Sequence, residues 1–342
     1  MRKVYDSLYY KERGDLRHKM GDNQGAIRDY SKVIKLNPND TEIYKKRATV
    51  KKEMGNYRGA TNDLNCAIVT CWFNMGKMLH EMGDKQGSID NYSQAIKLNP
   101  NYAIAYNNRG YVRYEMGDKQ GAMDDYNQAI KLNPNEAIPY YNRGYARDKM
   151  GDKQGAIDDY TQAIKLNPNY DDAYNNRGLV RGKMGDKLGA IDDFNQAIKL
   201  NPNYVVAYYN RGYARDKMGD KLGAIDDFNK AIKLEPNFAY AYNGRGLVLY
   251  EIGDYHEAIE DFTKAIKLNP KHPHTYINRG VTRYEMGDYQ RAIEDYNKAI
   301  KLNPNEAYPY YIRGYAREEM GDYRGATEDY NQASILGIGK EL

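Results

Sequence analysis

A unit of about 34 residues recurs almost unbroken along the chain, and it constrains the fold more than any other feature. The glycine of a recurring Met-Gly-Asp step returns at even spacing from Gly117 to Gly321. The series continues backwards through Gly83, Gly55 and Gly21, with one shortened step between Gly55 and Gly83. Ten repeats therefore fill the 342 residues. A period of this length predicts a solenoid, in which each repeat buries its apolar face against its neighbours.

Each repeat has the pattern of two helices separated by turns. In the repeat at residues 139–169, Gly151 ends a first helical stretch and Pro168 prevents a second one from continuing. Gly144 and Ala156 are small, which lets the two helices approach closely. We therefore expect an all-α fold without strands.

The same positions give the chain a resemblance to the tetratricopeptide repeat (TPR) family. The signature recurs, with single lapses, in nearly every repeat. In the fifth repeat the matching residues are Tyr140, Gly144, Ala156, Tyr160, Ala163 and Pro168. The resemblance implies a right-handed superhelical solenoid of about ten helix-turn-helix repeats. It also implies that the first helix of each pair lines a concave groove, and that the protein is a non-catalytic scaffold for protein–protein interaction.

The N-terminal repeats depart from the regular pattern. Residues 1–68 form the degenerate repeats 1 and 2, and residues 69–342 form the regular repeats 3–10 of one continuous solenoid. The Asn-Pro turn is missing at an irregular junction near residues 68–73. No Gly or Pro interrupts residues 62–75, so either two helices join into one or a tight turn remains; we expect the tight turn.

The C-terminal end carries apolar residues, among them Ile335 and Leu336, where arrays normally have a polar cap. We expect either that the chain is an excised fragment or that this end pairs with another copy.

Two arginines one helical turn apart recur in the first helices, for example Arg109 and Arg113. They could form a phosphate-binding ladder, or they could neutralise second-helix acids such as Asp125. In repeat 3, Met75 stands at the first arginine position and Asn91 at the second acid position. Because the two charges disappear together, we expect a structural ion pair, since a lone partly buried charge is costly.

An asparagine usually precedes the first arginine of each repeat. A side-chain amide offers both a donor and an acceptor, so a row of amides can hold the backbone of an extended peptide. This row resembles the asparagine ladder in the TPR domain of the O-linked N-acetylglucosamine transferases. The predicted peptide-binding asparagines are Asn74, Asn108, Asn142, Asn176, Asn210 and Asn278.

The chain has 36 Tyr against 5 Phe, which favours rings with one wet edge, as on a binding surface. The tyrosines predicted beside the asparagine row are Tyr111, Tyr114, Tyr141, Tyr145, Tyr209 and Tyr213, with Tyr250, Tyr284, Tyr311 and Tyr315 further along. These residues could instead pack between neighbouring first helices. We favour a groove that binds a protein or peptide partner.

Net charge is +4 on a chain with 29% charged residues, which gives no bulk electrostatic case for nucleic acid or for a membrane surface. A helical repeat that binds single-stranded RNA and a self-assembling architectural spacer are the alternatives. The N-terminus lacks an apolar stretch of signal-peptide length, so we expect a cytoplasmic protein.

No catalytic constellation, cofactor motif or metal site is expected. His272 and His274 flank a proline and lack the further ligands of a metal site. Cys66 and Cys71 fit neither a metal pair nor a redox motif, and we expect them to be packing residues.

Overall fold

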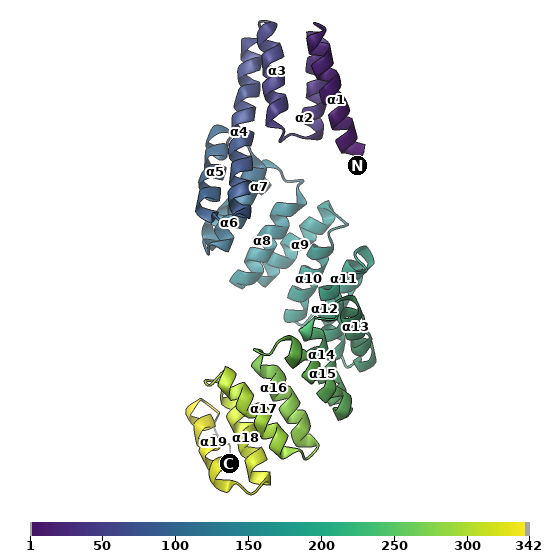
Figure 1. The fold of residues 1–342 in the computed structure, drawn as a ribbon, viewed down its shortest axis with the longest axis vertical. Coiled ribbons are helices and arrows are strands. Elements are labelled where there is room, and N and C mark those ends of the chain that lie inside the picture. Colours follow the sequence, from purple (N-terminus) through teal and green to yellow (C-terminus); the bar gives the residue numbers. More distant parts are fainter. Residues whose placement is uncertain (1, 339–342) are drawn as a thin grey trace. The chain divides into compact units, whose positions relative to one another are not determined.

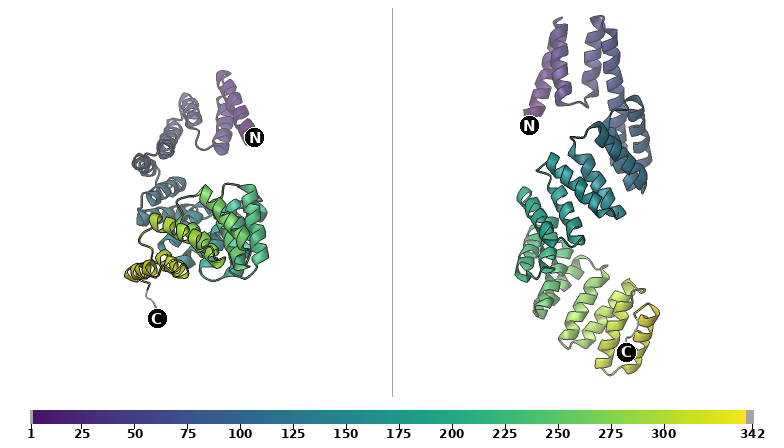
Figure 2. Two further views of the ribbon diagram at one scale, coloured as in Figure 1. Left: turned by 60° about the horizontal axis from the view of Figure 1, so that its bottom comes forward. Right: turned by 180° about the vertical axis from the view of Figure 1, so that it is seen from behind.

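The structure, a computed structural model, describes residues 2–338 as helices joined by short turns, without a strand in that range. The chain forms two compact parts, which we call the N-terminal half (to Pro168) and the C-terminal half (from Asn169). Each half holds five of the ten repeats, and in each repeat two helices pack side by side (Figures 1 and 2). The predicted all-α helix-turn-helix solenoid is confirmed.

The helices of the N-terminal half are α1 (Arg2–Lys19), α2 (Asn23–Leu36), α3 (Thr41–Glu53), α4 (Tyr57–Glu81), α5 (Lys85–Leu98), α6 (Ala103–Glu115), α7 (Lys119–Leu132), α8 (Ala137–Met150) and α9 (Lys153–Leu166). Those of the C-terminal half are α10 (Asp171–Lys183), α11 (Lys187–Leu200), α12 (Val205–Asp216), α13 (Lys221–Leu234), α14 (Ala239–Glu251), α15 (Tyr255–Leu268), α16 (Pro273–Glu285), α17 (Tyr289–Leu302), α18 (Ala307–Glu319) and α19 (Tyr323–Ile335).

A glycine and an aspartate build the turn inside most repeats, whereas repeat 2 has Asn56 at the aspartate position. Gly151 has a φ of 92°, in the left-handed region that ends a helix without a Cβ clash. The next residue, Asp152, caps the second helix, because its Oδ1 accepts the N–H of Gly155 at 2.9 Å. The Met-Gly-Asp step therefore ends one helix and starts the next.

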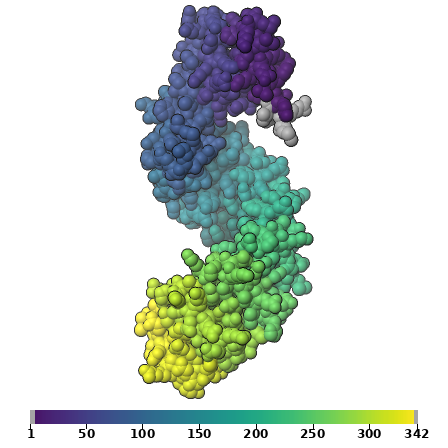
Figure 3. Space-filling model, in the orientation of Figure 1, coloured from purple at the N-terminus to yellow at the C-terminus, as the bar shows by residue number. Residues whose placement is uncertain are grey.

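The two helices of a repeat touch where a glycine faces an aromatic ring. A Cβ built on Gly178 would lie 2.8 Å from Cε1 of Phe194 and 3.1 Å from the carbonyl oxygen of Ala190. A larger residue there would have to displace the Phe194 ring, so the glycine sets how closely α10 and α11 pack. Helix α2 packs against α1 and α3, and α3 packs against α4; this purple-to-blue part of the N-terminal half forms a filled surface in the space-filling view (Figure 3).

The junction between repeats 2 and 3 is one continuous helix, so the tight turn that we expected at residues 68–73 is wrong. The 25-residue α4 packs against α3 near its start and against α5 near its end (Figure 1). No residue between 62 and 75 can break the helix, and each backbone N–H keeps its partner four residues back.

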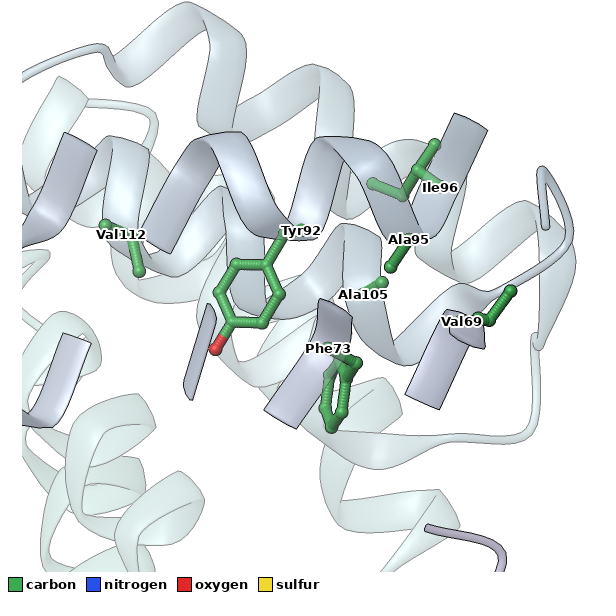
Figure 4. Packing of buried hydrophobic residues seen from close by; sticks show 7 residues of the cluster. All are labelled: Val69, Phe73, Tyr92, Ala95, Ile96, Ala105 and Val112. Carbon is green, nitrogen blue, oxygen red and sulfur yellow. The ribbon is translucent and has the colours of Figure 1, made fainter. Parts of the chain in front are cut away.

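Burial explains why α4 stays continuous through the junction. Its Val69 and Phe73 enter a cluster with Tyr92, Ala95, Ile96, Ala105 and Val112 of the next two helices (Figure 4). The ring centroid of Phe73 lies 5.6 Å from that of Tyr92 and 5.3 Å from that of Tyr102. A turn at residue 70 would withdraw Val69 and Phe73 from this cluster. The division into degenerate repeats at residues 1–68 and regular repeats at residues 69–342 stays a prediction.

Candidate functional site

The recurring arginines are bound to acids of their own repeat. In repeat 4, Nε and Nη2 of Arg109 donate to the two carboxylate oxygens of Asp125 at 2.9 and 2.6 Å, and Nη1 of Arg113 donates to the same carboxylate at 2.9 Å. The side chain of Asp125 is only 4% exposed. The equivalent pairs are Arg13–Asp29, Arg47–Asp63, Arg143–Asp159, Arg177–Asp193, Arg211–Asp227, Arg245–Asp261, Arg279–Asp295 and Arg313–Asp329.

The predicted structural ion pair is therefore confirmed, and these arginines do not form a phosphate-binding ladder. A bidentate pair between a guanidinium and a carboxylate uses the fork that would otherwise grip a phosphate.

Repeat 3 shows how the array closes without these charges. Nδ2 of Asn91 donates to the carbonyl of Gly87 at 2.7 Å. In repeat 4 the second arginine, Arg113, approaches the equivalent carbonyl of Gly121 at 3.4 Å. The amide thus replaces one arginine contact, while Oδ1 of Asn91 is buried without a hydrogen-bond partner.

Three of the six predicted asparagines donate to an asparagine in the preceding repeat. Nδ2 of Asn210 donates to Oδ1 of Asn175 at 2.9 Å, and these side chains are 8% and 2% exposed. Asn142 and Asn278 make the same bond, at 2.9 and 3.2 Å, to Asn107 and Asn243. These amide donors therefore join neighbouring first helices, in the manner of the packing alternative.

The other three asparagines are placed differently. Asn74 is exposed on α4, and its amide approaches the carbonyl of Asn39 at 3.4 Å. Oδ1 of Asn108 accepts from the amide of Asn107 at 3.2 Å, and Asn176 accepts from Asn175 at 3.3 Å. A role for any of the six in holding a peptide backbone stays a prediction.

Sequence analysis missed the acceptors Asn107, Asn175 and Asn243. They recur in every second repeat, at twice the basic period. Comparing each repeat with the next but one would have revealed this alternation.

The six predicted tyrosines differ in their exposure. Tyr111, Tyr145 and Tyr213 are exposed on the first helices. The rings of Tyr141 and Tyr209 pack on second-helix rings, Tyr141 on Tyr160 at 5.7 Å and Tyr209 on Phe228 at 5.9 Å between centroids. Tyr114 is half-buried, with its ring 5.6 Å from that of Tyr145. The exposed set is therefore the one available for contact with a partner.

Several hollows lie beside the first helices, and second-helix residues such as Tyr92 and Phe194 contribute to their lining. The asparagine hollow, about 250 Å³, is lined by Lys77, His80, Glu81, Tyr92, Asn107, Asn108, Tyr111, Val112 and Asn142. The lysine pocket, about 350 Å³, is lined by Gly178, Leu179, Gly182, Lys183, Lys187, Ala190, Phe194, Asn210, Tyr213, Ala214 and Lys217. The tyrosine pocket, about 380 Å³, is lined by Tyr250, Val281, Tyr284, Glu285, Tyr296, Tyr308, Ile312 and Tyr315.

A small cluster of charged side chains includes His80, which lines the asparagine hollow. Nε2 of His80 lies 2.9 Å from Glu115, and Lys85 lies 3.3 Å from the same carboxylate. The bond from His80 is the main cause that lowers the pKa of Glu115. Burial raises the pKa of Tyr92 and Tyr111, so both phenols stay neutral hydrogen-bonding groups.

No group of His, Cys, Asp and Glu within residues 2–338 could hold a metal ion. Nδ1 of His272 forms a hydrogen bond with Oγ1 of Thr275 at 2.9 Å, at the start of α16. Cys66 and Cys71 are both exposed on α4, so the expectation that they are packing residues is wrong. The cysteines are exposed because Val69 and Phe73 lie on the buried face of the continuous helix α4.

In the part of the chain that the structure describes, no helix is long and apolar enough to cross a membrane. The cytoplasmic location expected from the sequence stays a prediction. Ile335 is exposed at the end of α19, and pairing of this end with another copy also stays a prediction.

Sequence models of one family match most of the chain. The model described as TPR repeat matches residues 14–68, 76–117 and 110–151. The model described as tetratricopeptide repeat matches residues 137–170, 171–204, 205–238, 239–272 and 273–306. The chain therefore belongs to the tetratricopeptide repeat family, whose repeats serve as protein-interaction scaffolds.

Solved structures of the same family are similar to the chain. A tetratricopeptide repeat protein from Parabacteroides merdae is 19% identical, with a TM-score of 0.57, over 76% of this chain and 98% of that protein. The Cut9–Hcn1 complex is 14% identical, with a TM-score of 0.57, over 98% of this chain and 74% of the matched one. MamA is 31% identical, with a TM-score of 0.45, over 48% of this chain and 96% of MamA. The first two share the fold. No curated protein matches the sequence.

Proposed function

We propose that the protein is a non-catalytic scaffold whose first helices bind an extended segment of a partner protein. The exposed Tyr111, Tyr145 and Tyr213 supply contact area, and the asparagines beside them supply hydrogen bonds to backbone. Tyrosine suits this role because it is rigid and broad and has a polar tip.

One observation carries the proposal: predicted site residues line hollows of both halves. Asn108, Asn142 and Tyr111 share the asparagine hollow, and Asn210 and Tyr213 share the lysine pocket. The lysine pocket has apolar walls and a few polar groups, which is the usual form of a recognition site, whereas the asparagine hollow is lined mainly by polar side chains. Asn142 and Asn210 each spend one N–H on a neighbouring asparagine, and a primary amide has a second N–H with which to meet a peptide carbonyl.

Internal pairing argues against the RNA alternative. The recurring arginines form bidentate ion pairs with aspartates. Binding to RNA needs basic side chains that are free to contact phosphates and so release the counterions of the RNA.

The test is affinity capture from a lysate of the source cells, with the wild-type chain beside a Tyr111→Ala/Tyr145→Ala/Tyr213→Ala variant. The matched control is Tyr323→Ala, which removes an equally exposed ring at the start of a second helix. We expect the triple variant to lose a partner that the wild type and the control retain. Circular dichroism confirms that all three chains are folded.

Equal capture by the triple variant would contradict the proposal. Capture of RNA with a steep dependence on salt would favour the RNA-binding alternative. A mass that rises with concentration and without added partner would favour the self-assembling spacer.

A further inference from the structure

Charge changes sign along the C-terminal half. Two residues before the turn glycine, repeats 6 and 7 carry Lys183 and Lys217, whereas repeats 8 to 10 carry Glu251, Glu285 and Glu319. Two residues after that glycine, lysine in repeats 6 and 7 gives way to tyrosine in repeats 8 to 10. The two regions meet where Lys221 forms an ion pair with Glu251. Each region contains one of the pockets described above.

The lysine pocket combines an apolar floor with a cationic rim. Phe194, Leu179 and Ala190 form apolar parts of its lining, and Lys183, Lys187 and Lys217 also line it, with the ammonium of Lys217 paired to Asp216. The pocket exists because repeat 6 has Gly182 at the position where repeats 8 and 9 carry a tyrosine. An aliphatic or aromatic group next to a carboxylate matches this chemistry.

Two of the three lysines, Lys187 and Lys217, are held by other groups of the chain. Nζ of Lys187 donates to the carbonyl of Lys217 at 2.8 Å. Asp216 lies 3.0 Å from Lys217, and this bond raises the pKa of the Lys217 ammonium, so it stays charged.

The tyrosine pocket has the opposite character. Four of its eight lining residues are partly or fully accessible tyrosines, Tyr250, Tyr284, Tyr308 and Tyr315, and no cationic side chain lines it. Aromatic faces attract a cation through their quadrupole, most strongly when the cation is desolvated.

Carboxylates strengthen that attraction. Glu285 lines the pocket, and neither Glu285 nor Glu319 forms an ion pair within residues 2–338. Burial, followed by the charge of Glu319, raises the pKa of Tyr284, which keeps its phenol neutral. A lysine or arginine side chain of a partner could therefore stack on the tyrosine rings and form an ion pair with Glu285.

We propose that the first helices of the C-terminal half bind a partner segment with opposite charges at its two ends, an acidic end with an apolar group in the lysine pocket and a basic side chain in the tyrosine pocket. This inference rests on the proposed function and specifies the charge of each end of the partner segment and the pocket that receives it. Charge segregation of this kind fixes the register of a segment more than it adds affinity.

The test uses three fluorescein-labelled peptides of identical composition and the full chain. One begins with Asp-Leu-Glu and ends with Arg-Lys across a Gly/Ser spacer, the second has these ends exchanged, and the third alternates the charges. We expect one of the two segregated peptides to bind about tenfold more tightly than the other two at low salt, as two weak charge contacts allow. Fluorescence anisotropy measures the three affinities.

Charge reversal then assigns each end. Glu285→Lys/Glu319→Lys should abolish the preference and favour a peptide that is acidic at both ends. Lys183→Glu/Lys187→Glu should favour a peptide that is basic at both ends. The control is Glu260→Lys/Glu294→Lys, which makes the same change at exposed positions of second helices and should leave the preference intact.

Equal affinity for the three peptides, no binding of any of them, or an unchanged preference in both reversal variants would overturn the inference. A captured partner that needs Tyr213 but ignores both charge reversals would leave the proposed function standing and remove this inference alone. Loss of all peptide binding together with retained capture by the tyrosine variant would remove both.

Discussion

The amide of Asn210 donates to Oδ1 of Asn175 at 2.9 Å, across 35 residues and between the neighbouring first helices α10 and α12. Asn210→Ala should destabilise the C-terminal half by about 1–3 kcal/mol, because it leaves a buried acceptor without a partner. Asn175→Ala/Asn210→Ala should cost less than the two single variants added together. Urea unfolding measures all three. An unchanged midpoint for Asn210→Ala would mean that this amide serves only a ligand.

The arginine pairs predict a comparison that the chain itself supplies. Arg109→Met should cost roughly 3 kcal/mol, because Asp125 stays buried with one arginine instead of two. The triple variant Arg109→Met/Arg113→Leu/Asp125→Asn copies repeat 3 and should be more stable than Arg109→Met alone. Thermal unfolding by circular dichroism gives the order of the two variants. The reverse order would show that repeat 3 is stabilised by other contacts.

Continuity of α4 predicts a sharp difference between two substitutions at one exposed residue. Cys71→Pro should destabilise the N-terminal half by about 3 kcal/mol or more, because proline removes a bond inside the helix and clashes with the preceding turn. Cys71→Ala should change the free energy of unfolding by less than about 0.5 kcal/mol. Urea titration of both variants checks this. Equal stability of the two would indicate a turn at this residue.

Acid should destabilise the N-terminal half through the paired carboxylate of Asp29. The bond from Arg13 is the main cause that lowers the pKa of Asp29 below its ordinary value of 3.8. Because the folded-state pKa is the lower one, this contribution to stability is complete above pH 3.8 and is lost as the pH falls through the folded-state pKa. The midpoint temperature of thermal unfolding should therefore decrease as the pH is lowered below about 4, and the decrease should be less steep in Asp29→Asn. Identical slopes in the two proteins would contradict this.

The sequence predicted what depends on one repeat alone. Met-Gly-Asp and Asn-Pro steps mark the helix ends, because Gly151 takes a positive φ and Asp152 caps the next helix. The ion pairs were predictable because the chain carries its own exception in Met75 and Asn91. Because the ten repeats are so similar, they can be compared with one another position by position, and a departure in one repeat then stands out.

Features that link different repeats were missed. The bond from Asn142 to Asn107 alternates along the array, so averaging over single repeats hides it. The pockets were missed because they arise from what is absent, such as a side chain at Gly182. The continuous α4 depended on burial of Phe73 against Tyr92, which no local turn signal reveals.

The shared helix α4 also limits how this gene could change in length. Duplication of one repeat length within repeats 4 to 10 adds one complete helix pair, whichever residue the copy starts from, because each copy restores both turns. The step from Gly55 to Gly83 lacks one of these turns, so a copy made there adds a second fused helix instead of a pair. Repeats 2 and 3 share α4, so neither can be added or removed as a complete helix pair without the other. The repeats that follow them can be added or removed one at a time.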